Sequence, residues 1–134
     1  MKTADTSTIV AAFASWHALH EAARQELDRG LDLIEHCALE TYSVLTRLPP
    51  PHRVRGEVVR DFLAARFQRP FLRLAPQAYR AFVLDLPNRQ ILGGSSYDAL
   101  VAATAAASEA SLVTCDRRAS VTYERYGVRT LFLS

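Results

Sequence analysis

Four carboxylates stand close to the points where apolar segments of this chain begin or end: Asp5, Glu40, Asp98 and Asp116. Burying a charge without a partner costs several kcal/mol or shifts the pKa of the group until the charge is lost. Four acids brought together would therefore repel one another strongly unless a divalent cation lay among them. Because all four donors are carboxylate oxygens, the set favours a hard cation, Mg²⁺ or Mn²⁺, over zinc.

The elements that must position these acids are predicted from hydrophobic periodicity and from turn residues. Gly30 ends one helical pattern, Pro49 to Pro51 end another, and Pro76 suits the first turn of a further helix. The pattern predicts strands at 3–5, 31–36, 71–74, 112–115 and 128–133, and helices at 9–15, 17–29, 38–48, 54–67, from 76 onward, 97–107 and 119–126. Strands alternating with helices predict an α/β fold with a parallel sheet covered on both faces.

This arrangement predicts where the four acids lie. In an open parallel sheet, ligands bind at the carboxyl ends of the strands. Asp5 and Asp116 are expected at those ends of the first and penultimate strands, and Glu40 and Asp98 in the first turns of helices that begin at the same edge. All four side chains can then converge on one site.

Length and composition bound the class of protein. A chain of 134 residues with 49% hydrophobic and 22% charged residues is expected to form a single domain, residues 1–134, and is neither disordered nor fibrous. No apolar run approaches the roughly 18 residues that would span a bilayer, and the start of the chain lacks a signal-peptide core. We therefore expect a soluble, cytoplasmic protein without a membrane role.

Positive charge is concentrated in the middle of the chain. From Arg47 to Arg89 there are nine Arg against three acids, whereas the remainder of the chain is acidic. Arg binds phosphate through a bidentate fork, so a nucleic-acid backbone is one candidate partner for this segment. The alternative is that these side chains merely solvate the helices that carry them.

Four short motifs around the acids resemble those of the PIN-domain ribonucleases, especially the VapC-type toxins of bacterial toxin–antitoxin pairs. The opening Ala4-Asp5-Thr6-Ser7 is similar to the N-terminal acidic motif of that family, and the segment 38–45 to its helix-borne Glu. The segments 96–105 and 112–119 resemble its third and fourth motifs. Each motif alone is weak, but four in order at suitable spacing are jointly specific, and they span the whole chain.

The resemblance implies a three-layer α/β/α sandwich whose central parallel sheet has four to five strands in the order 3-2-1-4-5. It also implies endoribonuclease activity dependent on Mg²⁺ or Mn²⁺, a homodimer, and inhibition by a small antitoxin protein. The implied site consists of Asp5, Glu40, Asp98 and Asp116 as metal ligands, with Ser7 and Thr114 as hydroxyl partners. Some members carry a further acid after the fourth motif; Arg117 and Arg118 stand there instead, which disfavours a second tightly bound metal ion.

The two cysteines, Cys37 and Cys115, are expected to remain reduced thiols. Two cysteines are too few for a disulfide framework or a four-thiolate zinc site. In the strand order of the family they follow strands two places apart, roughly 10 Å from each other, which is beyond disulfide reach.

Two other function classes remain open. The first is a catalytically inactive PIN-like module that binds RNA or a protein without cutting. The second is another Mg²⁺ enzyme on an α/β sheet, such as a phosphatase or a phospho-receiver domain, which needs a well-placed Lys. The only lysine is Lys2, expected at the opposite end of the first strand from the acids, which disfavours the second class.

Overall fold

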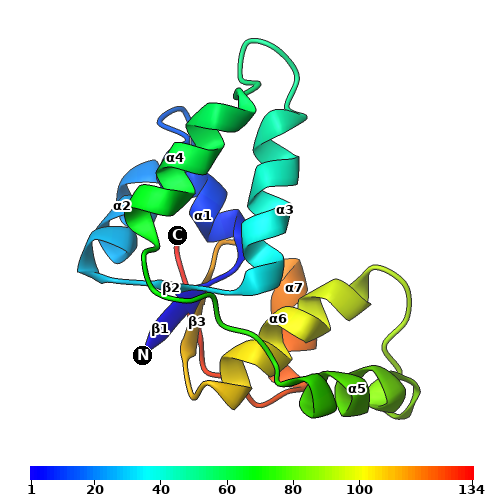
Figure 1. Cartoon of the computed structure of the whole chain (residues 1–134). Helices are drawn as coiled ribbons and strands as arrows, with labels where there is room; N and C mark the ends of the chain where they lie inside the picture. The colour runs from blue at the N-terminus through cyan, green and yellow to red at the C-terminus, as the bar shows by residue number, and fades with distance from the viewer.

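The computed structural model describes residues 1–134 and contains seven α-helices, one 3-10 helix and four strands (Figure 1). The elements are β1 (Lys2–Ala4), α1 (Thr6–Phe13), α2 (His20–Arg29), β2 (Asp32–Leu33), α3 (Glu35–Thr46), α4 (Gly56–Arg66), α5 (Pro76–Asp85), η1 (Leu86–Arg89), α6 (Ser95–Ala107), β3 (Ser111–Thr114), α7 (Arg117–Glu124) and β4 (Thr130–Phe132). Strands therefore alternate with helices, as the hydrophobic pattern predicts.

The four strands form one parallel sheet in the order β2-β1-β3-β4. The predicted strand at 71–74 is reduced to a single parallel bridge between Leu72 and Ile34, outside β2. Counting that bridge, the order of the predicted strands is 3-2-1-4-5, which confirms the α/β fold with four to five strands. The order reverses between β1 and β3, so the carboxyl ends of these two strands form the switch point at which such sheets bind ligands.

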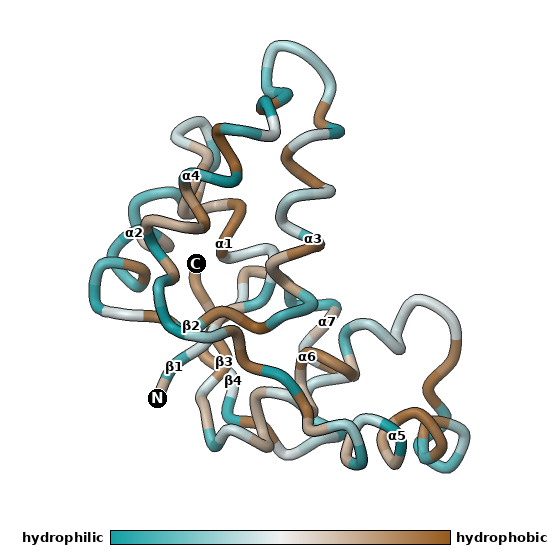
Figure 2. The backbone as a smooth tube through the Cα atoms, viewed as in Figure 1, coloured by the Kyte–Doolittle hydropathy of each residue, from teal (hydrophilic) through white to brown (hydrophobic).

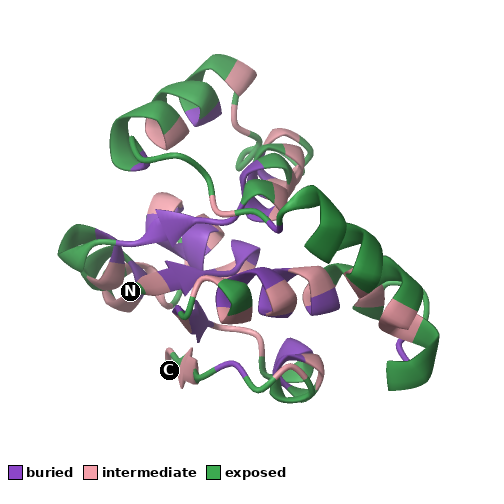
Figure 3. Ribbon diagram, turned by 60° about the horizontal axis from the view of Figure 1, so that its bottom comes forward, coloured by how far each residue is buried: buried purple, intermediate pink, exposed green.

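Helices cover both faces of the sheet. Parallel crossovers are almost always right-handed. The step from β1 to β2 moves in one direction along the sheet, and the steps from β2 to β3 and from β3 to β4 move in the other. The crossover helices α1 and α2 consequently pack together on one face, and α6 and α7 pack together on the other. This is the three-layer α/β/α arrangement, with the most buried residues in the central strands (Figure 3).

The core lies between the sheet and the helices that flank it. Its largest cluster has 20 buried residues, among them Leu33 and Leu112 of the strands and Ile9 and Val101 of the helices. The alanine-rich sequence of α6 allows its backbone to pack closely, since Ala99, Ala102 and Ala105 are all fully buried. The side chain at position 98, one residue before this buried row, is thereby held at the edge of the sheet.

Helices α3 and α4 run side by side as an arm that extends from the sheet, and the loop between them is largely hydrophilic (Figures 1 and 2). Leu45 and Val59, both fully buried, are the core residues of this arm. The sequence pattern predicts Val58, Phe62 and Ala65 as inward residues of α4. Phe62 is partly buried and packs against the core cluster, as predicted, but Val58 and Ala65 are exposed and Val59 is buried instead, so the prediction is wrong for these two.

Two further local details differ from expectation. The sequence predicts Thr6 and Ser7 as the cap of the first helix, but α1 is capped by Asp5, which accepts a hydrogen bond from the backbone N–H of Thr8. Helix α3 begins at Glu35, earlier than predicted, because the strand before it is only two residues long. Cys37 and Cys115 are free thiols, as expected. No helix has the length and apolar character needed to cross a membrane.

Candidate active site

A cleft of about 600 Å³ opens beside the carboxyl ends of β1 and β3, and we call it the acid pocket. Helices α1, α3, α6 and α7 supply its walls, and Figure 1 shows the start of α3 next to α6 and α7. Five of the six residues singled out by the sequence line it: Asp5, Ser7, Glu40, Asp98 and Asp116. The sixth, Thr114, lies beneath the lining and is fully buried.

Asp5 is the most enclosed of the acids, with only 4% of its surface exposed. Its Oδ1 accepts hydrogen bonds from the Ser7 hydroxyl at 2.5 Å and from the Thr8 backbone N–H at 3.3 Å. Its Oδ2 accepts from the Tyr123 hydroxyl at 2.7 Å and from the Thr114 hydroxyl. Burial raises the pKa of Asp5, and the hydrogen bonds from Ser7, Thr114 and Tyr123 oppose that shift without cancelling it.

Ser7 and Thr114 connect Asp5 to the strand end that carries Asp116. The Ser7 hydroxyl accepts a hydrogen bond from the backbone N–H of Cys115 at 3.0 Å, and the Thr114 hydroxyl accepts from that of Asp116 at 2.9 Å. Asp116 itself caps α7, since its Oδ1 accepts from the second and third backbone N–H groups of that helix at 3.0 and 3.2 Å. Both hydroxyls therefore fix the relative positions of two acids.

Glu40 reaches the pocket from the second turn of α3, not from the first turn as the sequence pattern predicts. The Thr6 hydroxyl donates a hydrogen bond to its Oε1 at 2.5 Å. Its Oε2 lies 3.9 Å from Nε2 of His36, one helical turn earlier. One oxygen of Glu40 is thus bonded within the protein and the other is open.

Asp98 lies in the first turn of α6, as predicted, and its carboxylate is half-buried and accepts no hydrogen bond from the protein. Partial burial raises its pKa, and the negative charges of Asp116, Asp5 and Glu40 raise it further. The positive charge of Arg118 lowers it. Asp98 is therefore close enough to the other three acids to be repelled by them electrostatically.

The donor chemistry of the acid pocket fits a hard divalent cation, because every candidate ligand is an oxygen. The carboxylate oxygens that accept no bond from the protein are both those of Asp98, Oδ2 of Asp116 and Oε2 of Glu40. Those of Asp5 are taken by donors on four residues, Ser7, Thr8, Thr114 and Tyr123, which fill the accepting capacity of a carboxylate. In this arrangement no three His, Cys, Asp or Glu side chains are close enough together to hold a metal ion.

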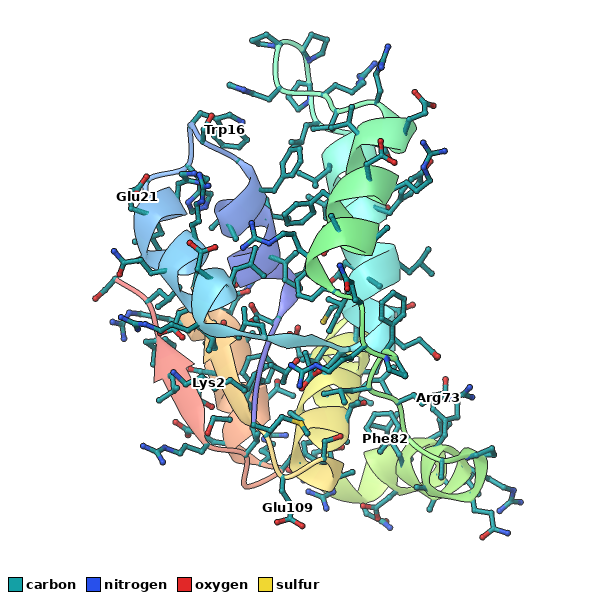
Figure 4. All side chains as sticks on the ribbon, turned by 60° about the vertical axis from the view of Figure 1, so that its left-hand side comes forward. Lys2, Trp16, Glu21, Arg73, Phe82 and Glu109 are labelled. Carbon is teal, nitrogen blue, oxygen red and sulfur yellow. The ribbon has the colours of Figure 1, made fainter.

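Sequence reasoning missed Tyr123, Thr6 and, in part, Arg118. Tyr123 is separated from Asp5 by 118 positions, and its place on a short helix looks like an ordinary core position. Arg118 drew notice only as a departure from an acidic position, yet it is the only basic residue that lines the pocket. Lys2 pairs instead with Glu26 of α2 at 3.1 Å, at the opposite end of β1 (Figure 4), so the pocket has no lysine.

The arginine-rich segment is more fully paired than its sequence suggests. Six of its nine arginines form ion pairs with carboxylates: Arg55, Arg60, Arg66, Arg69, Arg73 and Arg89. Arg73, labelled in Figure 4, lies 3.8 Å from Glu35, and Arg69 lies 3.0 Å from the buried Asp32. Arg47, Arg53 and Arg80 have no carboxylate partner. The segment is therefore only partly available to a phosphate backbone.

Comparison with known proteins identifies the class to which this fold and this pocket belong. Residues 3–125 match the PIN domain family, and the chain belongs to that family. This result confirms the resemblance carried by the four acidic motifs.

Curated relatives narrow the class further. Proteins named ribonuclease VapC40 from two strains of Mycobacterium tuberculosis, CDC 1551 / Oshkosh and ATCC 25618 / H37Rv, are 51% identical over 124 residues, which is 92% of this chain and 92% of each relative. A protein named ribonuclease VapC27, from the second strain, is 40% identical over 126 residues, covering 94% of this chain and 85% of the relative. The chain is thus a PIN-domain ribonuclease of the VapC type.

Proposed function

We propose that this protein is a divalent-metal-dependent endoribonuclease that hydrolyses RNA phosphodiester bonds, and that it is the toxin of a type II toxin–antitoxin pair. The observation that carries the proposal is that the acids of four motifs, far apart in the sequence, line a single pocket. The names of the VapC relatives support the reaction class.

In the proposed site, Asp5, Glu40, Asp98 and Asp116 hold Mg²⁺ or Mn²⁺. When bound, such an ion lowers the pKa of water and neutralises charge that develops on the phosphodiester. The open oxygens of Asp98, Asp116 and Glu40 support their role directly. Asp5 would need to exchange one of its four donors, and Ser7 is the candidate because it is only half-buried, whereas Thr114 and Tyr123 are buried.

The other residues of the pocket have positioning and electrostatic roles in this proposal. The buried hydroxyls of Thr114 and Tyr123 hold the Asp5 carboxylate in place by hydrogen bonds, and the Thr6 hydroxyl holds one oxygen of Glu40 in the same way. Arg118 supplies a positive charge that favours ionised Asp98 and that is available to an RNA phosphate. A single cation beside one arginine is the arrangement we favour over two cations.

The proposed partners are an RNA substrate, a small antitoxin protein and a second copy of the chain, with the cytoplasm as the place of action. Trp16 is 50% exposed at the turn after α1 (Figure 4), and with Phe13 it supports docking of an antitoxin helix there. Exposed apolar side chains on α3 and α5, including Leu39 and Leu84, support homodimerisation. One core cluster drawing on residues from Ala4 to Val128 supports a single domain over residues 1–134.

A second candidate function is an inactive PIN-like module that binds RNA or a protein without cutting. It is favoured by one observation: the acids lie too far apart here to share an ion, and protein donors occupy Asp5 fully.

Cleavage assays separate the two functions. Purified protein is incubated with total cellular RNA in Mg²⁺, in Mn²⁺ and in chelator, beside Asp5→Asn and Asp98→Asn. We expect cleavage only with a divalent ion, and a loss on the order of 100-fold in either variant. Asp61→Asn, which changes an exposed acid paired with Arg60, is the matched control and should cleave like the wild type. Cleavage that is equal in all variants would refute the proposed site, and binding without cleavage under every condition would favour the inactive module.

A further inference from the structure

Tyr97 is an aromatic residue on the rim of the acid pocket that the proposed metal site does not use. It precedes Asp98 in the first turn of α6, so its Cα lies about 3.8 Å from that of a proposed metal ligand. Its exposed fraction is 58%, although burial of an aromatic ring would be favourable. An exposed ring at this place is available to whatever the pocket binds.

The ring of Tyr97 is held from one side. It stacks on the imidazole of His36 with the ring centroids 5.4 Å apart and the planes at 5°. His36 is held in turn by its place on α3, one turn before Glu40, with its Nε2 buried and 3.9 Å from a Glu40 oxygen. The two rings therefore form a stacked pair that joins α3 to α6 and leaves the exposed surface of Tyr97 beside the acids.

A flat aromatic surface next to a phosphodiester-cleaving site suits a nucleobase. Stacking of a base on an aromatic side chain contributes about 1–3 kcal/mol and tolerates any base, since each base has a π-face. A base inside a duplex has both faces covered by its neighbours, so only an unpaired, unstacked nucleotide can present a face to the protein. A Tyr ring at this position would select RNA by the exposure of a base and not by its sequence.

We propose that Tyr97, supported by His36, stacks on an unpaired base beside the scissile phosphodiester. This inference rests on the proposed ribonuclease function and adds to it a residue that holds the substrate next to the acid pocket. Tyr97 acts here as a substrate-binding residue.

The test measures stacking separately from cleavage. An RNA that the wild type cleaves in a loop is made with 2-aminopurine next to the cut bond, and its fluorescence is followed during titration with protein in chelator. We expect the wild type to quench the fluorescence, because stacking quenches this base, and Tyr97→Leu to lose the quenching. With Mn²⁺, Tyr97→Leu should cleave the loop RNA on the order of 10-fold more slowly at subsaturating RNA. Tyr97→Phe keeps the ring and should retain both signals.

Tyr79→Leu is the matched control, since Tyr79 is 49% exposed on α5 and does not line the acid pocket. It should behave like the wild type in both assays. If Tyr97→Leu quenches the fluorescence as strongly as the wild type does, the proposal is overturned. This holds whether the variant still cleaves RNA or has lost cleavage together with a change of oligomeric state, which sedimentation would detect. Equal wild-type cleavage of the same sequence in a loop and in a duplex would also overturn it. Absence of cleavage of any RNA by the wild type would instead contradict the proposed function. The titration is then made with a stem-loop RNA that carries 2-aminopurine in its loop, and equal quenching by the wild type and Tyr97→Leu would still overturn the proposal for Tyr97.

Discussion

Tyr123 has no direct part in the proposed reaction, but its hydrogen bond to Asp5 affects the protonation of the most enclosed acid of the candidate site. Its hydroxyl is buried and donates to Oδ2 of Asp5, while Ser7, Thr8 and Thr114 supply the other donors to that carboxylate. Burial of Asp5 raises its pKa, and these donors limit the rise. The negative charge of Asp5 is therefore stabilised by a small number of identifiable groups, each of which can be removed singly.

Tyr123→Phe should destabilise the metal-free protein by about 1–2 kcal/mol at neutral pH, because a hydrogen bond to a buried carboxylate is lost without a change in shape. Removing this donor should raise the pKa of Asp5 further. The loss should be greatest at neutral pH and should shrink in acid, where Asp5 is protonated in both proteins. Urea unfolding in chelator at two pH values measures both effects. Equal stabilities at neutral pH would show that the hydroxyl does not support Asp5.

Asp98 gives a prediction of pH dependence. Its pKa in the folded protein is raised above 3.8 by burial and by the neighbouring acids, so the folded state binds the proton more readily than the unfolded state. The stability of the metal-free protein should consequently fall as pH rises from about 3.8 through the raised pKa. Asp98→Asn should raise the Tm at pH 7 by roughly 2 °C, a small effect because solvent screens a half-buried charge, and should change little below pH 4.

Asp85→Asn is the control, because the pKa of Asp85 is shifted in the opposite direction to that of Asp98. Hydrogen bonds from Arg89 and Asn88 lower the pKa of Asp85, so its charge is favourable in the folded state. Its removal should not raise the Tm in chelator at pH 7. If Asp98→Asn fails to raise the Tm there, the four acids do not repel one another as their arrangement implies.

The acids and two of their hydroxyl partners, Ser7 and Thr114, could be found in the sequence, whereas Tyr123 could not, for a physical reason. Asp5 directly follows β1 and Asp116 lies two residues after β3, and an acid next to the end of a short strand is visible without a structure. The hydroxyl of Tyr123 reaches Asp5 only because two strands far apart in the chain are neighbours in the sheet. A local sequence pattern cannot predict such a contact.

Helix α3 positions both chemistry and the proposed substrate contact. Glu40, Val44 and Arg47 are spaced by four and three residues, so they lie on one face of the helix, and Glu40 and Val44 both line the acid pocket. The Arg47 side chain donates to the Ser43 hydroxyl at 2.6 Å and has no carboxylate partner. Among the arginines of the middle segment, Arg47 is therefore placed best to bind RNA that leaves the pocket along α3.

Arg47→Gln should weaken RNA binding and lower the slope of log K against log salt by about 0.7, the value for one lost phosphate contact with a single strand. Fluorescence anisotropy in chelator at several salt concentrations measures the slope. Arg29→Gln on α2 is the control, because Arg29 is exposed, pairs with Glu26 and does not line the acid pocket. A slope unchanged by Arg47→Gln would place the RNA path elsewhere.

The arm formed by α3 and α4 gives a prediction about packing. Val59 is fully buried beside Leu45, whereas the preceding Val58 is 41% exposed. Val59→Ala should cost about 2 kcal/mol of unfolding free energy, and Val58→Ala less than about 0.5 kcal/mol. Chemical denaturation of the two variants tests this difference. If Val58→Ala cost more stability than Val59→Ala, α4 would turn the face that carries Val58 toward the core of the arm, as the sequence pattern predicts.

The elements themselves were largely predictable, and the errors share a cause. Helix ends were found where Gly30 and Pro49 to Pro51 interrupt the pattern, because these residues act locally. The starts of α1 and α3 and the inward face of α4 were missed, since they depend on strands of two or three residues and on contacts within the arm. Periodicity locates a helix but does not fix its rotation when valines are adjacent.

Taken over the whole molecule, charge is divided between two regions with different proposed tasks. The acid pocket concentrates negative charge at the switch point of the sheet, and the positive residues of the middle segment lie on the arm, on α5 and in the segments that follow α4 and α5. Ion pairs on an exposed surface contribute at most about 1 kcal/mol each, so the paired arginines other than Arg69, whose partner Asp32 is buried, can exchange a carboxylate for a phosphate at little cost. The fold thus supports the proposal of a cation-binding site and an anion-binding surface in one small domain.

Calorimetric titration of the purified chain with Mn²⁺ tests most directly whether the four carboxylates act as one metal site. We predict binding of one ion per chain at neutral pH, and weaker binding as the pH falls toward the raised pKa values of Asp5 and Asp98, because protons then compete with the ion for these carboxylates. Asp98→Asn should abolish or severely weaken this binding, and Asp61→Asn should leave it unchanged. Absence of binding at millimolar Mn²⁺, or equal binding by wild type and Asp98→Asn, would contradict a shared metal site.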